Sequence, residues 1–380
     1  SPERCDNFTR FCRHNADWLD DFGLFMAIKD AFNNQPWSDW PESLRRHQPD
    51  AIAAWRDSHA AQCDLYKYQQ YVFYEQWQTL KRYANRKGVK IFGDIPIFVA
   101  YDSADVWANQ HLFQLDAEGM PLAVAGVPPD YFSSTGQRWG NPLYNWQAHL
   151  AEDFHWWTRR FIHQLQQCDM IRIDHFRGFQ ACWSIPAAEK TAVNGHWEEA
   201  PGRKLLEKLQ TINAKMPIIA EDLGVITEDV EALRDDFGLP GMNILQFAFD
   251  SGPDNPYLPE NHAANSLVYT GTHDNDTTLG WWRSLPQAQK ERIRDYLGKP
   301  RPEMPWNLIE LAMASPARLC IIPCQDILGL DKSARFNTPG RATGNWQWQL
   351  SPEMLTDDLA RRLRKLTASY HRCPDKSAGD

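Results

Sequence analysis

The chain has 380 residues, 43% of them hydrophobic, which is enough to bury the core of one large domain or two ordinary ones. Its 49 acidic residues outnumber its 40 basic residues, which argues against nucleic acid as a partner, because such binding depends on clustered Lys and Arg. No stretch approaches the roughly 18 apolar residues of a membrane-spanning helix, and no signal-peptide pattern is visible, so we expect a cytoplasmic protein without a membrane partner.

Residues 1–61 contain no good strand and show helical patterning in two stretches, separated by the loop "NNQPWSDWP". They predict a helical subdomain, followed by a catalytic portion over 62–380. The segment 63–88 has apolar and aromatic residues at helical spacing and ends in Gly88, so it predicts a long helix with a glycine cap.

After this helix, short apolar runs alternate with amphipathic helical stretches, which is typical of parallel βα units. The predicted strands are 89–98, 168–174, 216–222, 242–249, 266–274 and 318–326, and the predicted helices are 153–167, 203–214, 227–236, 286–297 and 307–314. Six such units predict an α/β fold built as most of a (β/α)8 barrel, which needs eight strands in total.

Four of the predicted strands end in or near a carboxylate: Asp94, Asp174, Glu221 and Asp274. Polar residues at the carboxyl ends of barrel strands face the active site. Two carboxylates on opposite sides of a glycosidic bond can cleave it with retention of configuration, one as nucleophile and one as acid. A third can stabilise the positive charge of the transition state.

Arg172 is two residues before Asp174, so both side chains point to the same side of the strand, and the cation keeps the acid ionised. His175 and His273 lie next to two of these acids and could hydrogen-bond sugar hydroxyls. A carboxylate at the end of a strand is often only a helix cap or an ion-pair partner. For Asp94 that structural interpretation is the better one, because apolar residues continue after it.

Several long motifs resemble the amylomaltases, or 4-α-glucanotransferases. They are "GDIPIFVAYDSADVW" (93–107), "GVPPDYFSSTGQRWGNPLYNW" (126–146), "MIRIDHFRGF" (170–179), "IIAEDLGVIT" (218–227), "GMNILQFAF" (241–249), "YTGTHDNDTTLGWW" (269–282) and "RFNTPG" (335–340). The resemblance runs in order from about residue 60 to about residue 350. It implies a barrel of the α-amylase superfamily kind, with residues 1–61 as an α-helical insertion.

The resemblance also implies roles for residues at matching positions. Asp174 would be the nucleophile, Glu221 the acid/base and Asp274 the transition-state stabiliser, with Arg172 and His273 supporting them. The segment 126–146 would form a loop on the acceptor side, where Tyr131, Phe132, Trp139 and Asn141 would touch sugar. Aromatic residues over a covalent intermediate exclude water and favour transfer to a sugar hydroxyl.

Within this family the substrates would be malto-oligosaccharides and other α-1,4-glucans, with glucose or maltose as acceptor. We expect no cofactor and no metal, since the sequence has neither a nucleotide-binding glycine motif nor zinc-type cysteine spacing. The family normally begins with two further βα units, so we expect a chain that shows about six of the eight barrel strands.

Two alternatives stay open at this stage. A hydrolase of the α-amylase type would use the same three carboxylates, and a shortened chain could also be a non-catalytic piece that only binds glucan.

Overall fold

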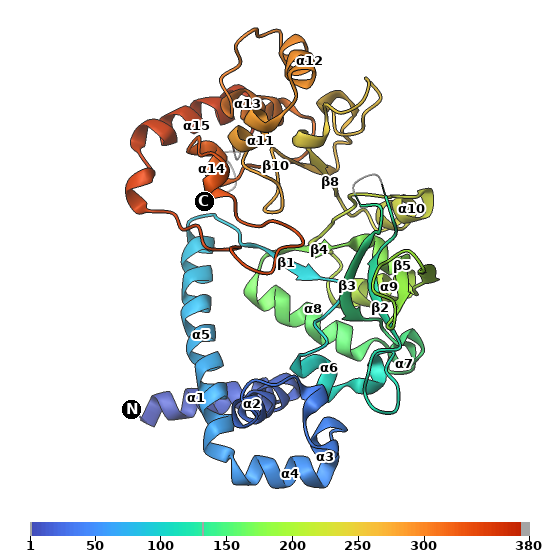
Figure 1. Ribbon diagram of the computed structural model, residues 1–380. Helices are drawn as coiled ribbons and strands as arrows, with labels where there is room; N and C mark the ends of the chain where they lie inside the picture. The colour runs from blue at the N-terminus through green and yellow to red at the C-terminus, as the bar shows by residue number, and fades with distance from the viewer. Residues whose placement is uncertain (1, 131–132, 374–380) are drawn as a thin grey trace. The chain divides into compact units, whose positions relative to one another are not determined.

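A computed structural model describes residues 2–130 and 133–373 (Figure 1). The chain divides into two compact units, Ser1–Phe237 (unit 1) and Gly238–Asp380 (unit 2). The predicted boundary at residue 61 falls inside a long helix, and the division into a helical subdomain and a catalytic portion stays a prediction. Within the described residues, no helix is long and apolar enough to cross a membrane.

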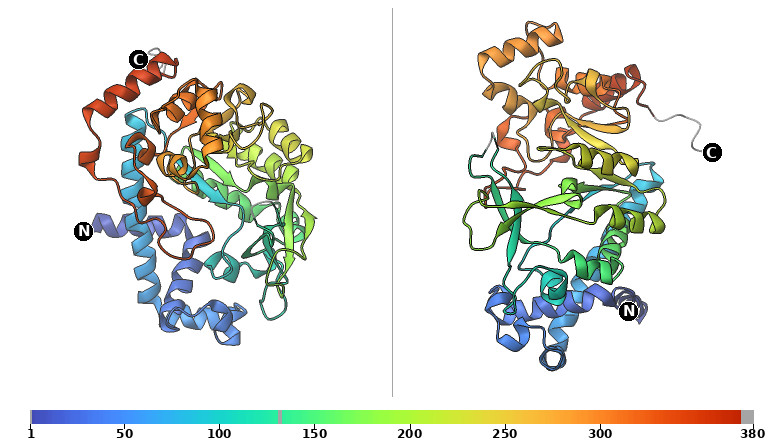
Figure 2. Two further views of the ribbon diagram at one scale, coloured as in Figure 1. Left: turned by 45° about the horizontal axis from the view of Figure 1, so that its top comes forward. Right: turned by 90° about the vertical axis from the view of Figure 1, so that its right-hand side faces the viewer.

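Unit 1 begins with the predicted helices. They are α1 (Pro2–His14), α2 (Ala16–Ala31), α3 (Glu42–Arg45), α4 (Pro49–Ser58) and α5 (Ala60–Arg86). Figure 2 shows α1 crossing α5, and both α1 and α2 pack against it. Phe11, Leu19 and Tyr71 form the buried contact between these three helices. Gly88 has a left-handed backbone, with φ of 73°, as expected for a glycine just after a helix.

The centre of unit 1 is a parallel sheet in the order β1-β4-β7, formed by β1 (Phe92–Pro96), β4 (Met170–Asp174) and β7 (Ile218–Ala220). The register pairs Asp94 with Arg172, and Ile173 with Ala220. Its connections contain α6 (Ala104–Ala108), α7 (Trp146–Ala151), α8 (His155–Gln167) and α9 (Gly202–Ile212), and α10 (Glu228–Asp236) follows β7. The carboxyl ends of these strands therefore meet at one edge.

Unit 1 also contains an antiparallel sheet that the sequence analysis missed. Its order is β3-β2-β5-β6, with β2 (Ala123–Val127), β3 (Gln137–Pro142), β5 (Ala181–Pro186) and β6 (His196–Glu199). Strands β2 and β3 form a hairpin whose connection lies within the predicted acceptor-side loop 126–146. The predicted acceptor-side loop is therefore supported by the antiparallel sheet.

Unit 2 contains a second parallel sheet in the order β10-β9-β8, from β8 (Gly241–Ile244), β9 (Ser266–Tyr269) and β10 (Leu319–Ile321). Its helices are α11 (Thr278–Ser284), α12 (Gln287–Leu297), α13 (Trp306–Ala314), α14 (Cys324–Ile327) and α15 (Asp357–Ser369). Val268, Ile293 and Leu308, each 0% exposed, join the sheet and helices in one apolar core.

All six predicted strands and all five predicted helices of the βα pattern are present among the described residues, although every strand is shorter than predicted. The strand predicted over 266–274 ends at Tyr269, and that predicted over 318–326 ends at Ile321. In the part of the chain that the structure describes, three parallel strands lie in each unit, so the fold is α/β as expected.

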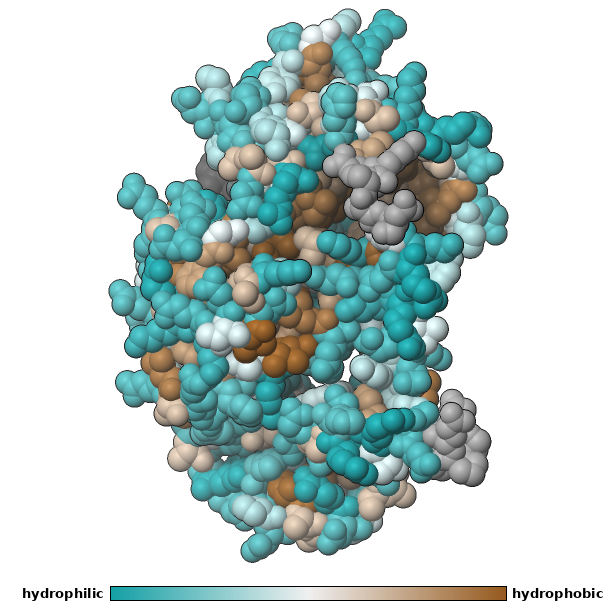
Figure 3. Space-filling view, turned by 180° about the vertical axis from the view of Figure 1, so that it is seen from behind, coloured by the Kyte–Doolittle hydropathy of each residue, from teal (hydrophilic) through white to brown (hydrophobic). Residues whose placement is uncertain are grey.

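Most residues on the face shown in Figure 3 are hydrophilic, and apolar residues appear there as separate patches. Six of the 17 tryptophans are buried, which accounts for part of the high tryptophan content as core packing: Trp37, Trp40, Trp107, Trp156, Trp157 and Trp306.

Candidate functional site

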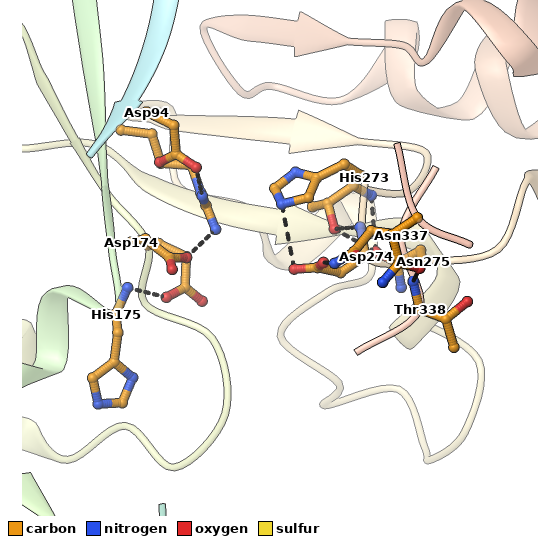
Figure 4. Close-up of polar contacts among 12 residues, drawn as sticks. Asp94, Asp174, His175, His273, Asp274, Asn275, Asn337 and Thr338 are labelled. Atoms are coloured by element: carbon orange, nitrogen blue, oxygen red, sulfur yellow. Dashed lines mark hydrogen bonds and ion pairs between the residues drawn. The ribbon is translucent and has the colours of Figure 1, made fainter. Parts of the chain in front are cut away.

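Arg172 joins two carboxylates at the carboxyl edge of the sheet in unit 1. Its Nη1 donates to Asp94 Oδ2 over 2.6 Å, and its Nη2 donates to Asp174 Oδ1 over 2.5 Å (Figure 4). Arg172 is 8% exposed, whereas both carboxylate side chains are 46% exposed. The predicted pairing of Arg172 with Asp174 is confirmed, and Asp94 has the ion-pair role expected for it.

Glu221 follows β7 directly, and its backbone N–H donates to the carbonyl of Ile173 on β4 over 3.1 Å. The two carboxylates Asp174 and Glu221 thus extend from neighbouring strands. Glu221 Oε2 accepts the backbone N–H of His175 over 2.7 Å (Figure 4), and its Oε1 accepts that of Leu223 over 3.2 Å. The carboxyl group is oriented by the loop that begins at His175.

Burial raises the pKa of Glu221 to about 7; Arg172 opposes this shift and the Asp174 carboxylate adds to it. Burial alone would lower the pKa of Arg172, but the nearby carboxylates of Asp94, Asp174 and Glu221 favour the charged guanidinium and raise it. An acid with its pKa near neutrality therefore stands beside a carboxylate that is paired with a cation.

His175 lies between Asp174 and the antiparallel sheet. Its backbone is left-handed, with φ of 55°, and its ring meets that of Trp139 on β3 edge to face, with centroids 4.8 Å apart. Burial lowers the pKa of His175 to about 4, so the imidazole is neutral at pH 7. Its Nε2 has no hydrogen-bond partner among the described residues.

The structure thus brings the predicted residue Trp139 next to the strand that carries Asp174. Asn141, also on β3, donates its side-chain N–H to the carbonyl of Val99 over 2.9 Å, which anchors the hairpin. The sugar contact predicted for Asn141 stays a prediction. Tyr131 and Phe132 lie outside the described residues.

Asp274 lies in unit 2, in the loop between β9 and α11, five residues beyond the end of the strand. Its Oδ1 accepts the side-chain N–H of Asn337 over 2.5 Å, and its Oδ2 lies 3.5 Å from His273 Nε2 (Figure 4). Arg335 Nη2 donates to the backbone carbonyl of Asp274 over 2.5 Å. The predicted neighbour His273 is therefore in contact with the acid.

Asn337 and Arg335 are functional candidates that the sequence analysis did not identify as such. Both belong to the motif "RFNTPG", to which no role was assigned. Because this motif is about 60 residues from Asp274, only the fold brings them together. They hold the loop of Asp274 from a second segment of unit 2.

Trp346 also lies against the Asp274 loop. It is 61% exposed, and its ring lies 5.3 Å from that of His273 and 5.6 Å from that of Phe336. Among the described residues, no three His, Cys, Asp or Glu side chains are grouped so as to hold a metal ion.

Comparison with known proteins identifies the family. A family model described as 4-alpha-glucanotransferase matches residues 1–356. The 4-alpha-glucanotransferase of Thermus thermophilus is 49% identical over 380 residues, covering 98% of this chain and 76% of that protein. The protein of the same name from Synechocystis sp. is 49% identical over 369 residues, covering 96% and 73%.

Among solved structures, the amylomaltase of Streptococcus agalactiae in complex with acarbose has a TM-score of 0.94 and 38% sequence identity, covering 98% of this chain and 76% of that chain. The chain therefore belongs to the 4-alpha-glucanotransferase family, enzymes that transfer segments of α-1,4-glucan from a donor to an acceptor.

Proposed function

We propose that this chain transfers α-1,4-glucan segments by a retaining double displacement, with Asp174 as nucleophile, Glu221 as acid/base and Asp274 as stabiliser of the transition state. The observation that carries the proposal is the pair Asp174 and Glu221 on neighbouring strands. Adjacent strands lie about 4.8 Å apart, which suits the short carboxyl separation of retaining enzymes. The two acids also differ in environment, as an acid and a nucleophile must.

In the first step, protonated Glu221 gives its proton to the glycosidic oxygen as the bond to the anomeric carbon breaks. Asp174 attacks that carbon and forms a covalent glucosyl ester, and the reducing-end fragment of the donor leaves. In the second step, ionised Glu221 removes the proton from an acceptor hydroxyl. That oxygen attacks the anomeric carbon and releases Asp174. A pKa near 7 allows Glu221 to serve both steps.

The proposed role of Asp274 rests on its motif and on the contacts that hold it. Asn337 and His273 fix the orientation of its carboxylate, and Arg335 fixes the backbone. An acidic group held in place before the reaction stabilises developing positive charge without reorganising. The sugar contacts of His273 and His175 belong to the same proposal.

The choice between transfer and hydrolysis depends on what reaches the intermediate. The β2-β3 hairpin places Trp139 against His175, the residue after the proposed nucleophile. Trp139 is 38% exposed, so part of its ring is open to a ligand. We infer that this ring covers the acceptor side and stacks on an acceptor such as glucose, maltose or a longer malto-oligosaccharide.

Two finer predictions belong here. The six parallel strands, three in each unit, together with the family match, support a barrel of the α-amylase superfamily kind. A cytoplasmic location also stays a prediction.

The test is to incubate the protein with maltotriose and resolve the products by length over time. We expect glucose and maltopentaose to appear together, followed by longer oligomers, at a constant total of reducing ends. The control is Glu221→Gln, which should make neither product. A rising total of reducing ends would mean hydrolysis and would contradict the proposal.

A further inference from the structure

The loop that carries Asp274 is fastened at its base by one buried carboxylate, that of Asp326. The loop begins at Thr270, directly after β9, and leads to Thr278, the first residue of α11. Asp326 lies in α14, a short helix that follows β10, and β10 pairs with β9. The acid thus comes from the element that follows the neighbouring strand.

Asp326 binds both ends of this loop. Its Oδ2 accepts the hydroxyls of Thr270 and Thr278, each over 2.6 Å, and its Oδ1 accepts the backbone N–H of Thr278 over 2.7 Å. Asp326 is 1% exposed and both threonines are 0% exposed. These donors are neutral, so the carboxylate is desolvated without an ion-pair partner among the described residues. Desolvation of this kind is costly, and hydrogen bonds to the carboxylate offset only part of it.

Capping of α11 does not account for this arrangement. The N-cap of α11 is Thr277, whose hydroxyl already accepts the backbone N–H of Gly280 over 3.1 Å. A cap also has no need of Thr270, which lies at the other end of the loop. The feature that requires an explanation is the bridge between the two ends.

Hydrogen bonds fix the conformation of the rest of the loop, so the position of the loop depends on its two ends. Gln246 donates its side-chain N–H to the carbonyl of Asp276 over 2.9 Å, and Asn275 Oδ1 accepts from the N–H and the hydroxyl of Thr272, each over 2.8 Å. These hydrogen bonds keep the loop in one conformation. A displacement of its two ends, Thr270 and Thr278, would therefore displace the Asp274 carboxylate as well.

We propose that Asp326 is a positioning residue for the transfer reaction: it closes the base of the 270–278 loop and so sets where the Asp274 carboxylate stands. The inference rests on the proposed role of Asp274 as stabiliser. A misplaced stabiliser weakens binding of the transition state more than binding of the ground-state sugar, so the loss should appear in kcat rather than in KM.

The test compares Asp326→Asn with a control that weakens unit 2 elsewhere. Ser315→Ala serves as control, because Ser315 is 5% exposed and its hydroxyl bonds His262 over 2.7 Å and the N–H of Ala317 over 3.1 Å, away from the loop. On maltotriose we expect D326N to lower kcat at least tenfold with KM within twofold, and S315A to change kcat less than twofold.

A second pair of variants keeps the test decisive if D326N does not fold. Thr270→Val removes only the bond to the loop's first residue and leaves Thr278 bonded to Asp326, whereas Thr270→Ser retains the hydroxyl. We expect T270V to lower kcat severalfold and T270S to stay close to the wild type. The inference would be overturned if T270V and T270S had the same kcat. It would also be overturned if D326N and S315A lost kcat in the same proportion to the fall in their thermal unfolding midpoints.

Hydrogen exchange distinguishes this inference from the proposed function. We expect the backbone amides of residues 271–277 to exchange faster in D326N or T270V than in the wild type, and unchanged in S315A and T270S. If the wild type failed to disproportionate maltotriose, the proposed function would fall, and exchange would still report on the bridge. Unchanged exchange in both D326N and T270V would overturn the bridge even in an active enzyme.

Discussion

Arg172 is the buried partner of two carboxylates, and this determines what the loss of either one does. Asp174→Ala removes the proposed nucleophile but leaves Arg172 paired with Asp94 over 2.6 Å. Since the Asp174 side chain is 46% exposed, its own packing contributes little. We expect D174A to abolish transfer while the free energy of unfolding changes by no more than about 1 kcal/mol.

Urea denaturation of D174A beside Arg172→Ala checks this. In R172A the two carboxylates lose their shared cation and a buried side chain disappears, so its stability should fall further than that of D174A. A D174A protein that unfolds readily would show that Asp174 has a structural role.

Glu221 determines the alkaline side of the pH profile. The acid must be protonated in the first step, and its pKa of about 7 lies above that of an ordinary glutamate. Because only the protonated form acts, kcat/KM should fall as pH rises through about 7 and be retained just below it. The measurement is kcat/KM for maltotriose between pH 4 and 9, and an alkaline limb far from 7 would contradict the assignment.

Trp139 offers a test of what makes the enzyme a transferase. Trp139→Ala should open the acceptor side to water, so we expect the ratio of hydrolysis to transfer to rise. The measurement is the number of newly formed reducing ends for each maltopentaose produced. Trp197 on β6 is the matched control, because it lies on the same sheet with 37% exposure and is covered by Arg177 at 3.8 Å. An equal rise in Trp197→Ala would mean that a damaged sheet, not an open acceptor side, is responsible.

At the scale of elements, the antiparallel sheet supports the acceptor-side hairpin. The close approach of strands β2 and β3 in this hairpin depends on Gly126. A Cβ at Gly126 would stand 2.1 Å from the carbonyl oxygen of Gln137 and 2.5 Å from Ile185 Cδ1. Gly126→Ala should therefore separate the strands and cost on the order of 2 kcal/mol of stability.

The control for this change is Gly252→Ala, where a Cβ would meet nothing within 4 Å. Thermal unfolding should show a lower midpoint for G126A than for G252A, and transfer should fall with it if the hairpin covers the acceptor. Equal midpoints would mean that the β2 backbone moves freely enough to accept the methyl group.

The sequence predicted the parallel strands well because each is a compact apolar run followed by a helix. It missed the antiparallel sheet because β2 and β3 read as "AVAGV" and "QRWGNP", where glycine and proline resemble turn residues. Within the sheet β3 pairs only with β2, and β2 pairs in turn with β5, about 60 residues along the chain. Pairing over that distance leaves no local signal.

The same limit applies to the site. Arg172 and Asp174 share one strand face, so their contact followed from spacing. The strand predicted over 266–274 was too long, because the hydroxyls of Thr270 and Thr278 bind Asp326 and the chain leaves the sheet after Tyr269. Only the fold brings Asn337, Arg335 and Asp326 to the Asp274 loop, and their residue types alone do not predict these contacts.

At the scale of the whole molecule, every proposed catalytic carboxylate lies at or beyond the carboxyl end of a parallel strand: Asp174 and Glu221 in unit 1, and Asp274 in unit 2. The chain spans about three quarters of the length of the Thermus thermophilus relative, and the match includes all three acids, which lie within residues 1–356. The central claim is that one of them, Asp174, becomes covalently bound to sugar.

Trapping the intermediate tests this claim most directly. In Glu221→Gln, α-maltotriosyl fluoride can still glycosylate the nucleophile, since fluoride leaves without an acid, but the base for the second step is missing. We predict a gain of one maltotriosyl group in the intact mass, located by trypsin digestion on the peptide 173–177, "IDHFR", which contains Asp174. Modification of the peptide that carries Asp274, or no adduct in a variant whose parent disproportionates maltotriose, would contradict the account.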